Sequence, residues 1–217
     1  MRRRTLAVTA AAVGGGVLVV AAVVTLAGPD ATRSTTPPPL AAPVSAESAC
    51  GLPGTPGDGT GGAAEARWQT VGAYALPVST TDGPGNRIQS GPWSCFTRTP
   101  SGAVLAGITI SVRASGAAEN WRDVIRTQTM PGAGQDAALA GSLGEADQVT
   151  VRGFTVVAYS PDRATVRYYL HSPKIDASCT TDVQWSGGDW RLVLGEDGST
   201  SSGCSQGAPV SFIPWGP

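Results

Sequence analysis

Residues 182–194 read DVQWSGGDWRLVL, and this stretch decides the fold. Apolar and polar side chains alternate on both sides of Gly187-Gly188, a pair of residues that can take the positive φ angles of a type I′ turn. The resulting hairpin places three pairs on one side: Trp185 with Trp190, Val183 with Leu192, and Thr181 with Leu194. Gln184 and Arg191 point to the other side. One apolar face predicts a sheet that packs against helices.

The residues before this hairpin predict further strands. Residues 149–159 and 164–171 are rich in β-branched and aromatic side chains, and a turn at residues 160–162 separates them. Another short strand is predicted within residues 67–75, and residues 80–91 are rich in turn formers. The sequence therefore predicts an antiparallel sheet in the second half of the chain.

Three helices are predicted ahead of the sheet. Thr99 followed by Pro100 supplies an N-cap hydroxyl and a proline at the first helical position, which predicts a helix over residues 102–114. Its later apolar residues also alternate as they would in a strand. Apolar residues at helical spacing predict a clearer helix over residues 119–129, and small residues favour a third over residues 135–143. Helices followed by an antiparallel sheet define an α+β fold.

The N-terminal part has the pattern of an anchor and a spacer. Arg2-Arg3-Arg4 precede an apolar stretch without charges, long enough for the roughly 20 residues of a spanning helix, and the arginines place the N-terminus in the cytoplasm. The sequence predicts a cytoplasmic tip (residues 1–5), a transmembrane helix (6–28), a disordered Pro/Gly-rich linker (29–65) and an extracytoplasmic α+β domain (66–217). A cleaved signal peptide is the alternative for the apolar segment.

The four cysteines fall outside the predicted membrane segment: Cys50, Cys95, Cys179 and Cys204. None belongs to a C-x-x-C pair, and the chain has one histidine, so zinc and thiol-redox motifs are absent. An even number of cysteines in an exported domain predicts two disulfides, with three possible connectivities. We favour Cys50–Cys95 and Cys179–Cys204, because each pair is consecutive and closes a segment that would otherwise be loose.

The charge balance argues against nucleic-acid binding. After Arg33 the chain has eleven Lys/Arg against fifteen Asp/Glu, whereas nucleic-acid binding needs a concentrated basic surface. We therefore expect no direct contact with nucleic acid. One lysine against fourteen arginines is typical of a GC-rich genome, such as that of an actinobacterium.

No residue pattern predicts a catalytic, cofactor or metal site. The sole histidine, His171, lies at a predicted strand end without a partner pattern, and residues 141–144 lack the spacing of a nucleophile elbow. Gly132 and Gly134 follow a helix end instead of a strand, so phosphate binding is not indicated. The tryptophans are interpreted as core residues in preference to a carbohydrate platform.

Several sequence strings resemble known proteins. FTVVAYSPDRATVRYYL (154–170) and TTDVQWSGGDWRLVL (180–194), placed after helices, resemble the cone-shaped fold of nuclear transport factor two and its relatives. ACGLPG (49–54), GPW-SCF-x3-P-x-GA (91–103) and GDWRL (188–192), behind an Arg-led anchor, are similar to uncharacterised actinobacterial membrane-anchored proteins associated with conjugation and integrative elements. Inner-membrane scaffold proteins of type IV secretion channels are similar in plan.

This resemblance implies a non-enzymatic structural or interaction subunit of a conjugative transfer apparatus. It would be a single-pass protein of the cell membrane, with an extracellular C-terminal domain and other membrane or cell-envelope proteins as partners. No cofactor is expected. Two alternatives stay open: a cell-surface ligand-binding or sensing domain, and an enzyme with a pocket carboxylate. The second follows from the resemblance, because cone folds can house a pocket with a carboxylate base; Tyr159, Tyr168, Tyr169 and Asp182 would line it here. The sequence leaves the oligomeric state undetermined.

Overall fold

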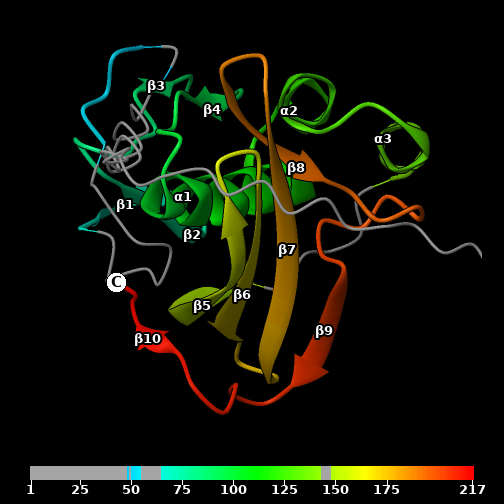
Figure 1. Ribbon diagram of the computed structural model, residues 1–217. Coiled ribbons are helices and arrows are strands. Elements are labelled where there is room, and N and C mark those ends of the chain that lie inside the picture. The colour runs from blue at the N-terminus through cyan, green and yellow to red at the C-terminus, as the bar shows by residue number, and fades with distance from the viewer. Residues whose placement is uncertain (1–47, 49, 55–64, 143–147) are drawn as a thin grey trace, which may run out of the picture. The chain divides into compact units, whose positions relative to one another are not determined.

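The main sheet of this α+β protein is antiparallel throughout (Figure 1). The computed structural model describes residue 48 and residues 50–54, 65–142 and 148–217. The predicted transmembrane helix and most of the predicted linker lie outside these residues. Within them, no helix has the length and apolar character needed to span a membrane.

Six of the described strands form this sheet: β5 (Thr150–Ser160), β6 (Arg163–His171), β7 (Asp176–Ser186), β8 (Asp189–Val193), β9 (Gly203–Gln206) and β10 (Ile213–Pro214). Their order is β10-β5-β6-β7-β8, and β9 pairs with β7 as well. The two short strands β8 and β9 therefore share one edge of the long strand β7. β5 and β6 begin and end within one residue of the predicted strands.

The predicted hairpin is confirmed. β7 and β8 are joined through Gly187 and Gly188, whose φ angles are 66° and 83°. Two of the three predicted pairs form: Trp185 with Trp190, and Val183 with Leu192. The third, Thr181 with Leu194, is wrong. β8 ends at Val193, and the same edge of β7 pairs with β9 at residues 177–180.

The first strands differ more from the prediction. The single strand predicted within residues 67–75 is a hairpin of β1 (Arg67–Val71) and β2 (Tyr74–Val78), which turns at Gly72 with a φ of 58°. The turn-rich segment contains β3 (Asn86–Arg87), which pairs with β4 (Trp93–Ser94).

The three predicted helices are present among the described residues, with α1 (Pro100–Val112), α2 (Trp121–Gln128) and α3 (Ala133–Ala140) as their bounds. The Thr99 hydroxyl accepts a hydrogen bond from Gly102 N at 3.0 Å, which confirms the predicted N-cap. α1 continues into a π-helical turn, η1 (Arg113–Ala117). Eleven of the thirteen residues of α1 are buried. A helix that is buried on all sides has no polar stripe, which explains its ambiguous sequence pattern.

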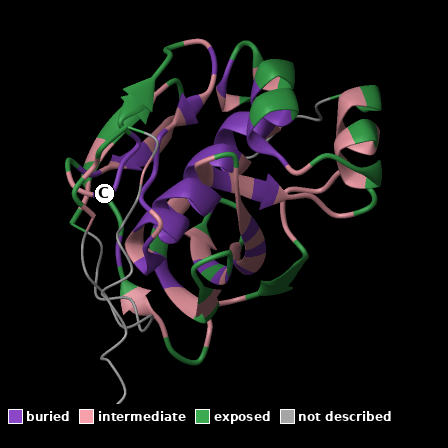
Figure 2. Cartoon of the chain, turned by 45° about the horizontal axis from the view of Figure 1, so that its top comes forward, coloured by how far each residue is buried: buried purple, intermediate pink, exposed green. Residues whose placement is uncertain are grey.

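α1 lies across one face of the main sheet (Figure 1). Figure 2 shows that buried residues concentrate along this helix and on the strands that face it. The backbone of α1 passes close to Tyr168 at Gly107, where a Cβ atom would collide with the Tyr168 hydroxyl. That hydroxyl donates a hydrogen bond to Val104 O at 2.7 Å. Glycine at position 107 therefore lets the helix and the sheet meet.

We expect Gly107→Ala to lower the free energy of unfolding by about 1–3 kcal/mol, because the added methyl group overpacks the contact with Tyr168. At an unobstructed helical position the same change stabilises by about 1 kcal/mol. Combining it with Tyr168→Phe, which removes the obstructing hydroxyl, should recover part of the loss. Urea denaturation of both single variants and the double variant measures the coupling. Strictly additive losses would contradict the predicted contact.

Candidate functional site

The predicted linker (residues 29–65) is fixed to the fold at one of its own residues, Cys50. Cys50 forms a disulfide with Cys95, and their Cα atoms are 6.1 Å apart. A second attachment is the hydrogen bond from Gly54 N to Thr81 O at 3.0 Å. One of the two predicted disulfides is thereby confirmed. It marks where a pull from the N-terminal segment would reach the domain.

Cys95 is in turn held by a carboxylate. Asp189, the first residue of β8, accepts hydrogen bonds from the backbone N–H groups of Cys95 at 2.7 Å, Phe96 at 2.9 Å and Trp190 at 2.9 Å. Burial raises the pKa of Asp189, while these amide donors and Arg191 act in the opposite direction. We call Cys50, Cys95, Phe96, Asp189 and Trp190 the anchoring junction. It joins the start of the domain to its main sheet.

The backbone at Cys95 is unusual for a residue with a side chain. Its φ angle is 77°, in the left-handed region that costs non-glycine residues of the order of 1–3 kcal/mol. Its N–H is bound by Asp189, and its carbonyl accepts a hydrogen bond from Gly85 N at 2.9 Å. Bonds on both sides of the residue therefore hold a conformation that the isolated chain would avoid.

Trp190 connects the anchoring junction to the hydrophobic core. Its side chain is 1% exposed, and its Nε1–H donates to Thr97 O at 2.7 Å. The Trp185 ring meets it edge-on, with 5.4 Å between centroids. Trp185 itself is only half-buried and lies under the guanidinium of Arg98, so the prediction that both tryptophans are core residues is fully met only by Trp190. Residues 91–103 and 188–192, which are far apart in the sequence, are in contact here through these hydrogen bonds.

A second buried carboxylate binds the residues that follow Cys95. Asp82 is 1% exposed and accepts hydrogen bonds from the hydroxyls of Thr97 at 2.9 Å, Thr99 at 3.1 Å and Thr81 at 2.9 Å. Residues 95–99 are therefore held by Asp189 at one end and by Asp82 at the other. Because Thr99 caps α1, the two carboxylates also set the start of that helix.

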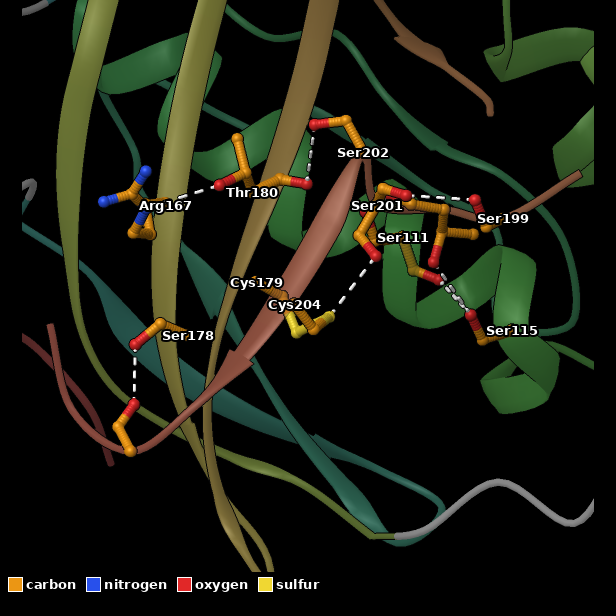
Figure 3. Close-up of a disulfide and its surroundings, with 12 residues drawn as sticks. Ser111, Ser115, Arg167, Ser178, Cys179, Thr180, Ser199, Ser201, Ser202 and Cys204 are labelled. Carbon is orange, nitrogen blue, oxygen red and sulfur yellow. Dashed lines mark hydrogen bonds between the residues drawn. A yellow bond between two sulfur atoms is a disulfide. The ribbon is translucent and has the colours of Figure 1, made fainter. Parts of the chain in front are cut away.

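The other predicted disulfide, Cys179–Cys204, is confirmed as well (Figure 3). The two cysteines lie directly opposite each other in the ladder between β7 and β9, with their Cα atoms 4.1 Å apart. The bond fixes β9, which is exposed at every residue, to the central strand β7.

His171 lies at the end of β6, as the sequence predicted, and it contacts an acidic residue there. Its Nδ1 atom lies 2.6 Å from Asp176 Oδ1, and the Tyr169 hydroxyl donates to Asp176 Oδ2 at 3.0 Å. These hydrogen bonds from His171 and Tyr169 lower the pKa of Asp176. The side chains of His171 and Asp176 are 46% and 42% exposed. The register of the β6–β7 hairpin, which pairs these two residues, is the signal that could have predicted the contact.

The four residues considered for a catalytic pocket do not converge. Tyr159 and Tyr168 lie on the face covered by α1, and their hydroxyls donate to backbone carbonyls. Tyr169 and Asp182 lie on the opposite face, where they bond to other strand side chains. Within the described part of the chain, no group of three or more His, Cys, Asp or Glu residues is placed to hold a metal ion.

Comparison with known proteins gives one match. A family model described as "Domain of unknown function (DUF8175)" matches residues 30–210. No curated protein and no solved structure matches the chain. The match covers nearly all of the described domain, including every residue of the anchoring junction.

Replacing Asp189 tests the junction. In Asp189→Asn, an amide NH₂ group would face backbone N–H donors, so at least one hydrogen bond to a charged acceptor is lost. We expect the free energy of unfolding to fall by about 1.5–3 kcal/mol, measured by urea denaturation. Asp162→Asn, in the turn between β5 and β6, is the matched control. Its side chain is 75% exposed, so its loss should stay below about 1 kcal/mol. Equal losses in the two variants would refute the special role of Asp189.

Proposed function

Since the chain belongs to the DUF8175 family, whose description names no activity, we propose a function for it from its own structure. We propose that it is a membrane-anchored interaction subunit that acts outside the cell membrane and has no enzymatic activity. The predicted span at residues 6–28 would hold it in the membrane, with the N-terminus in the cytoplasm.

The observation that carries this proposal is the covalent link at the anchoring junction. A pull from the predicted anchor reaches the described domain first at Cys50, and the disulfide passes it to Cys95. From there the hydrogen bonds to Asp189 pass it to the main sheet. The load thereby bypasses the small hairpin of β1 and β2, which follows Cys50 in the chain. A domain that bears load between a membrane and its partners needs such a link.

The two disulfides support the location outside the membrane. Disulfides persist in oxidising surroundings such as the cell exterior and are rare in the cytosol. Each of them closes a separate part of the domain, one at the entry of the chain and one at the edge strand β9. Both disulfides are therefore consistent with a domain that faces the cell exterior.

A third line of support is the use of the buried charges. Arg113 is fully buried and donates to backbone carbonyls of Gly91, Ile88 and Gln89, while its guanidinium lies 4.7 Å from the centroid of the Trp93 ring. Burial lowers the pKa of Arg113. Like Asp189, it holds loop backbone in place. These groups serve the rigidity that a structural subunit requires.

We further propose that the apparatus is one for conjugative transfer and that the domain is a variant of the cone-type fold. The conjugative assignment rests on the resemblance of the three motif strings, each of which contributes residues to the anchoring junction. Helices on one face of an antiparallel sheet are compatible with the cone plan. Partners would be other membrane or cell-envelope proteins. Individual contacts with them can be weak, because tethering raises the effective concentration of the partners to roughly millimolar.

Separating the domain from its anchor tests the proposal. In a strain that lacks the native gene, we expect a truncated chain that starts near Cys50 and is exported by an added cleavable signal peptide to form both disulfides and to fail to restore conjugative transfer. Fusing the same residues to an unrelated single-span anchor should restore much of the transfer frequency. The anchor would then be needed for its position and not for its sequence.

Two measurements accompany this test. Non-reducing peptide mapping confirms the two disulfides in the truncated chain, so that failure to fold is not mistaken for loss of function. Crosslinking in intact cells identifies the envelope proteins that contact the anchored domain. Full rescue by the truncated chain would refute the anchoring role, and normal transfer in the deletion strain would refute the conjugative role.

A further inference from the structure

A cavity of about 230 Å³ lies between α1, the main sheet and the loop that precedes β9. Part of its wall is apolar and includes Ile108, Val112, Leu170 and the Cys179–Cys204 disulfide. The rest carries hydroxyl groups, which come from Tyr74, Ser111, Ser115, Thr181, Thr200 and Ser201. None of the lining residues has a charged side chain. Figure 3 shows Ser111, Ser115 and Ser201 gathered beside the disulfide.

Thr181 is the most informative residue of this wall. It lies on the face of β7 that is turned toward α1 and is 3% exposed. Thr181 lines the cavity, and no hydrogen bond of its hydroxyl is seen within the part of the chain that the structure describes. A hydroxyl in this position keeps its donor and its acceptors available to a molecule in the cavity. A ligand that offers it an acceptor or a donor would therefore gain affinity.

Other hydroxyls of the wall are only weakly engaged. Ser111 Oγ is 3.5 Å from Thr200 O, and Ser201 Oγ is 3.4 Å from the sulfur of Cys204. The first distance is long for a hydrogen bond between oxygen atoms, and the second contact is weak because sulfur is a weak hydrogen-bond partner. These groups can turn toward a bound molecule at little cost.

The loop that closes the cavity is held in place before any ligand arrives. Ser199 Oγ donates to Ser201 O at 3.0 Å, and Gly195 N donates to Ser199 O at 2.9 Å. The Cys179–Cys204 disulfide fixes the far end of the loop to β7. A wall fixed in advance lowers the entropy cost of binding.

Size and charge restrict the ligand. An apolar cavity of about 150 Å³ can hold benzene, so this one has room for roughly ten non-hydrogen atoms. A charged molecule would lose its hydration without meeting an ionic partner on the wall. We propose that the cavity binds a small neutral molecule with one apolar face and one hydroxyl or carbonyl group, which Thr181 recognises. This site is distinct from the anchoring junction and does not depend on the proposed anchoring role.

Three probes of nearly equal size test the proposal: benzyl alcohol, the benzylammonium ion and benzoate. Each is titrated into the isotope-labelled full-length protein, and backbone amide shifts are followed by NMR. We expect benzyl alcohol to cause saturable shifts confined to residues around Ser111, Thr181 and Ser201. The two charged probes should cause none there, because the cavity has no charge to pair with them.

Variants then identify the contact. In Thr181→Val the recognising hydroxyl is replaced by a methyl group of similar size, and the Kd for benzyl alcohol should rise about tenfold. The matched control is Thr180→Val, the next residue of β7, whose hydroxyl accepts from Arg167 Nε at 3.3 Å on the opposite face (Figure 3). The Kd of Thr180→Val for benzyl alcohol should be unchanged. Ser111→Leu, which fills the cavity from α1, should abolish the saturable shifts.

Each other outcome overturns the proposal. Equal shifts with all three probes, or shifts that grow without saturation, mean that the cavity holds water and does not select a ligand. An unchanged Kd in both Thr181→Val and Ser111→Leu places the probe elsewhere. Amide spectra of each variant show whether it is folded. Ser111 lies in α1 and Thr181 in β7, so misfolding of one variant would still leave the other as a test.

Discussion

The carboxylate of Asp189 is the contact on which most of the described fold depends. It binds three backbone N–H groups in a buried place, where each would otherwise lack an acceptor. Through Cys95 it reaches the first disulfide, and through Phe96 and the threonines that follow it reaches the N-cap of α1. The helix then sets the face against which the sheet packs. One turn residue thus couples the hairpin, the entry of the chain and the central helix.

Local patterns predicted the elements whose side chains are sorted between core and solvent. The alternation around Gly187-Gly188 gave the register of β7 and β8 because one face of this hairpin is buried. The pair Thr99-Pro100 gave the start of α1 because capping depends on neighbouring residues alone. The consecutive cysteines gave both disulfides, since each links segments that are adjacent in the sheet or at the junction.

What the sequence did not reveal depends on residues far apart in the chain. Asp189 directly follows the Gly187-Gly188 turn, and nothing near it in sequence indicates that its partner Cys95 lies 94 residues earlier. β9 and β10 are short, and β9 is exposed throughout, so neither has an apolar alternation to detect. The cavity is lined by single hydroxyls from several elements, and serine or threonine at such positions looks like ordinary loop or strand composition.

The pairing of consecutive cysteines has a consequence for biogenesis. If the chain is exported from its N-terminal end, Cys50 and Cys95 reach the oxidising side before either of the other two cysteines. They can form their native bond when no competing thiol of the same chain is present, and Cys179 and Cys204 then have only each other. The order of emergence alone thus selects one of three connectivities. Such a chain can mature with an oxidant and does not require an isomerase to correct wrong pairs.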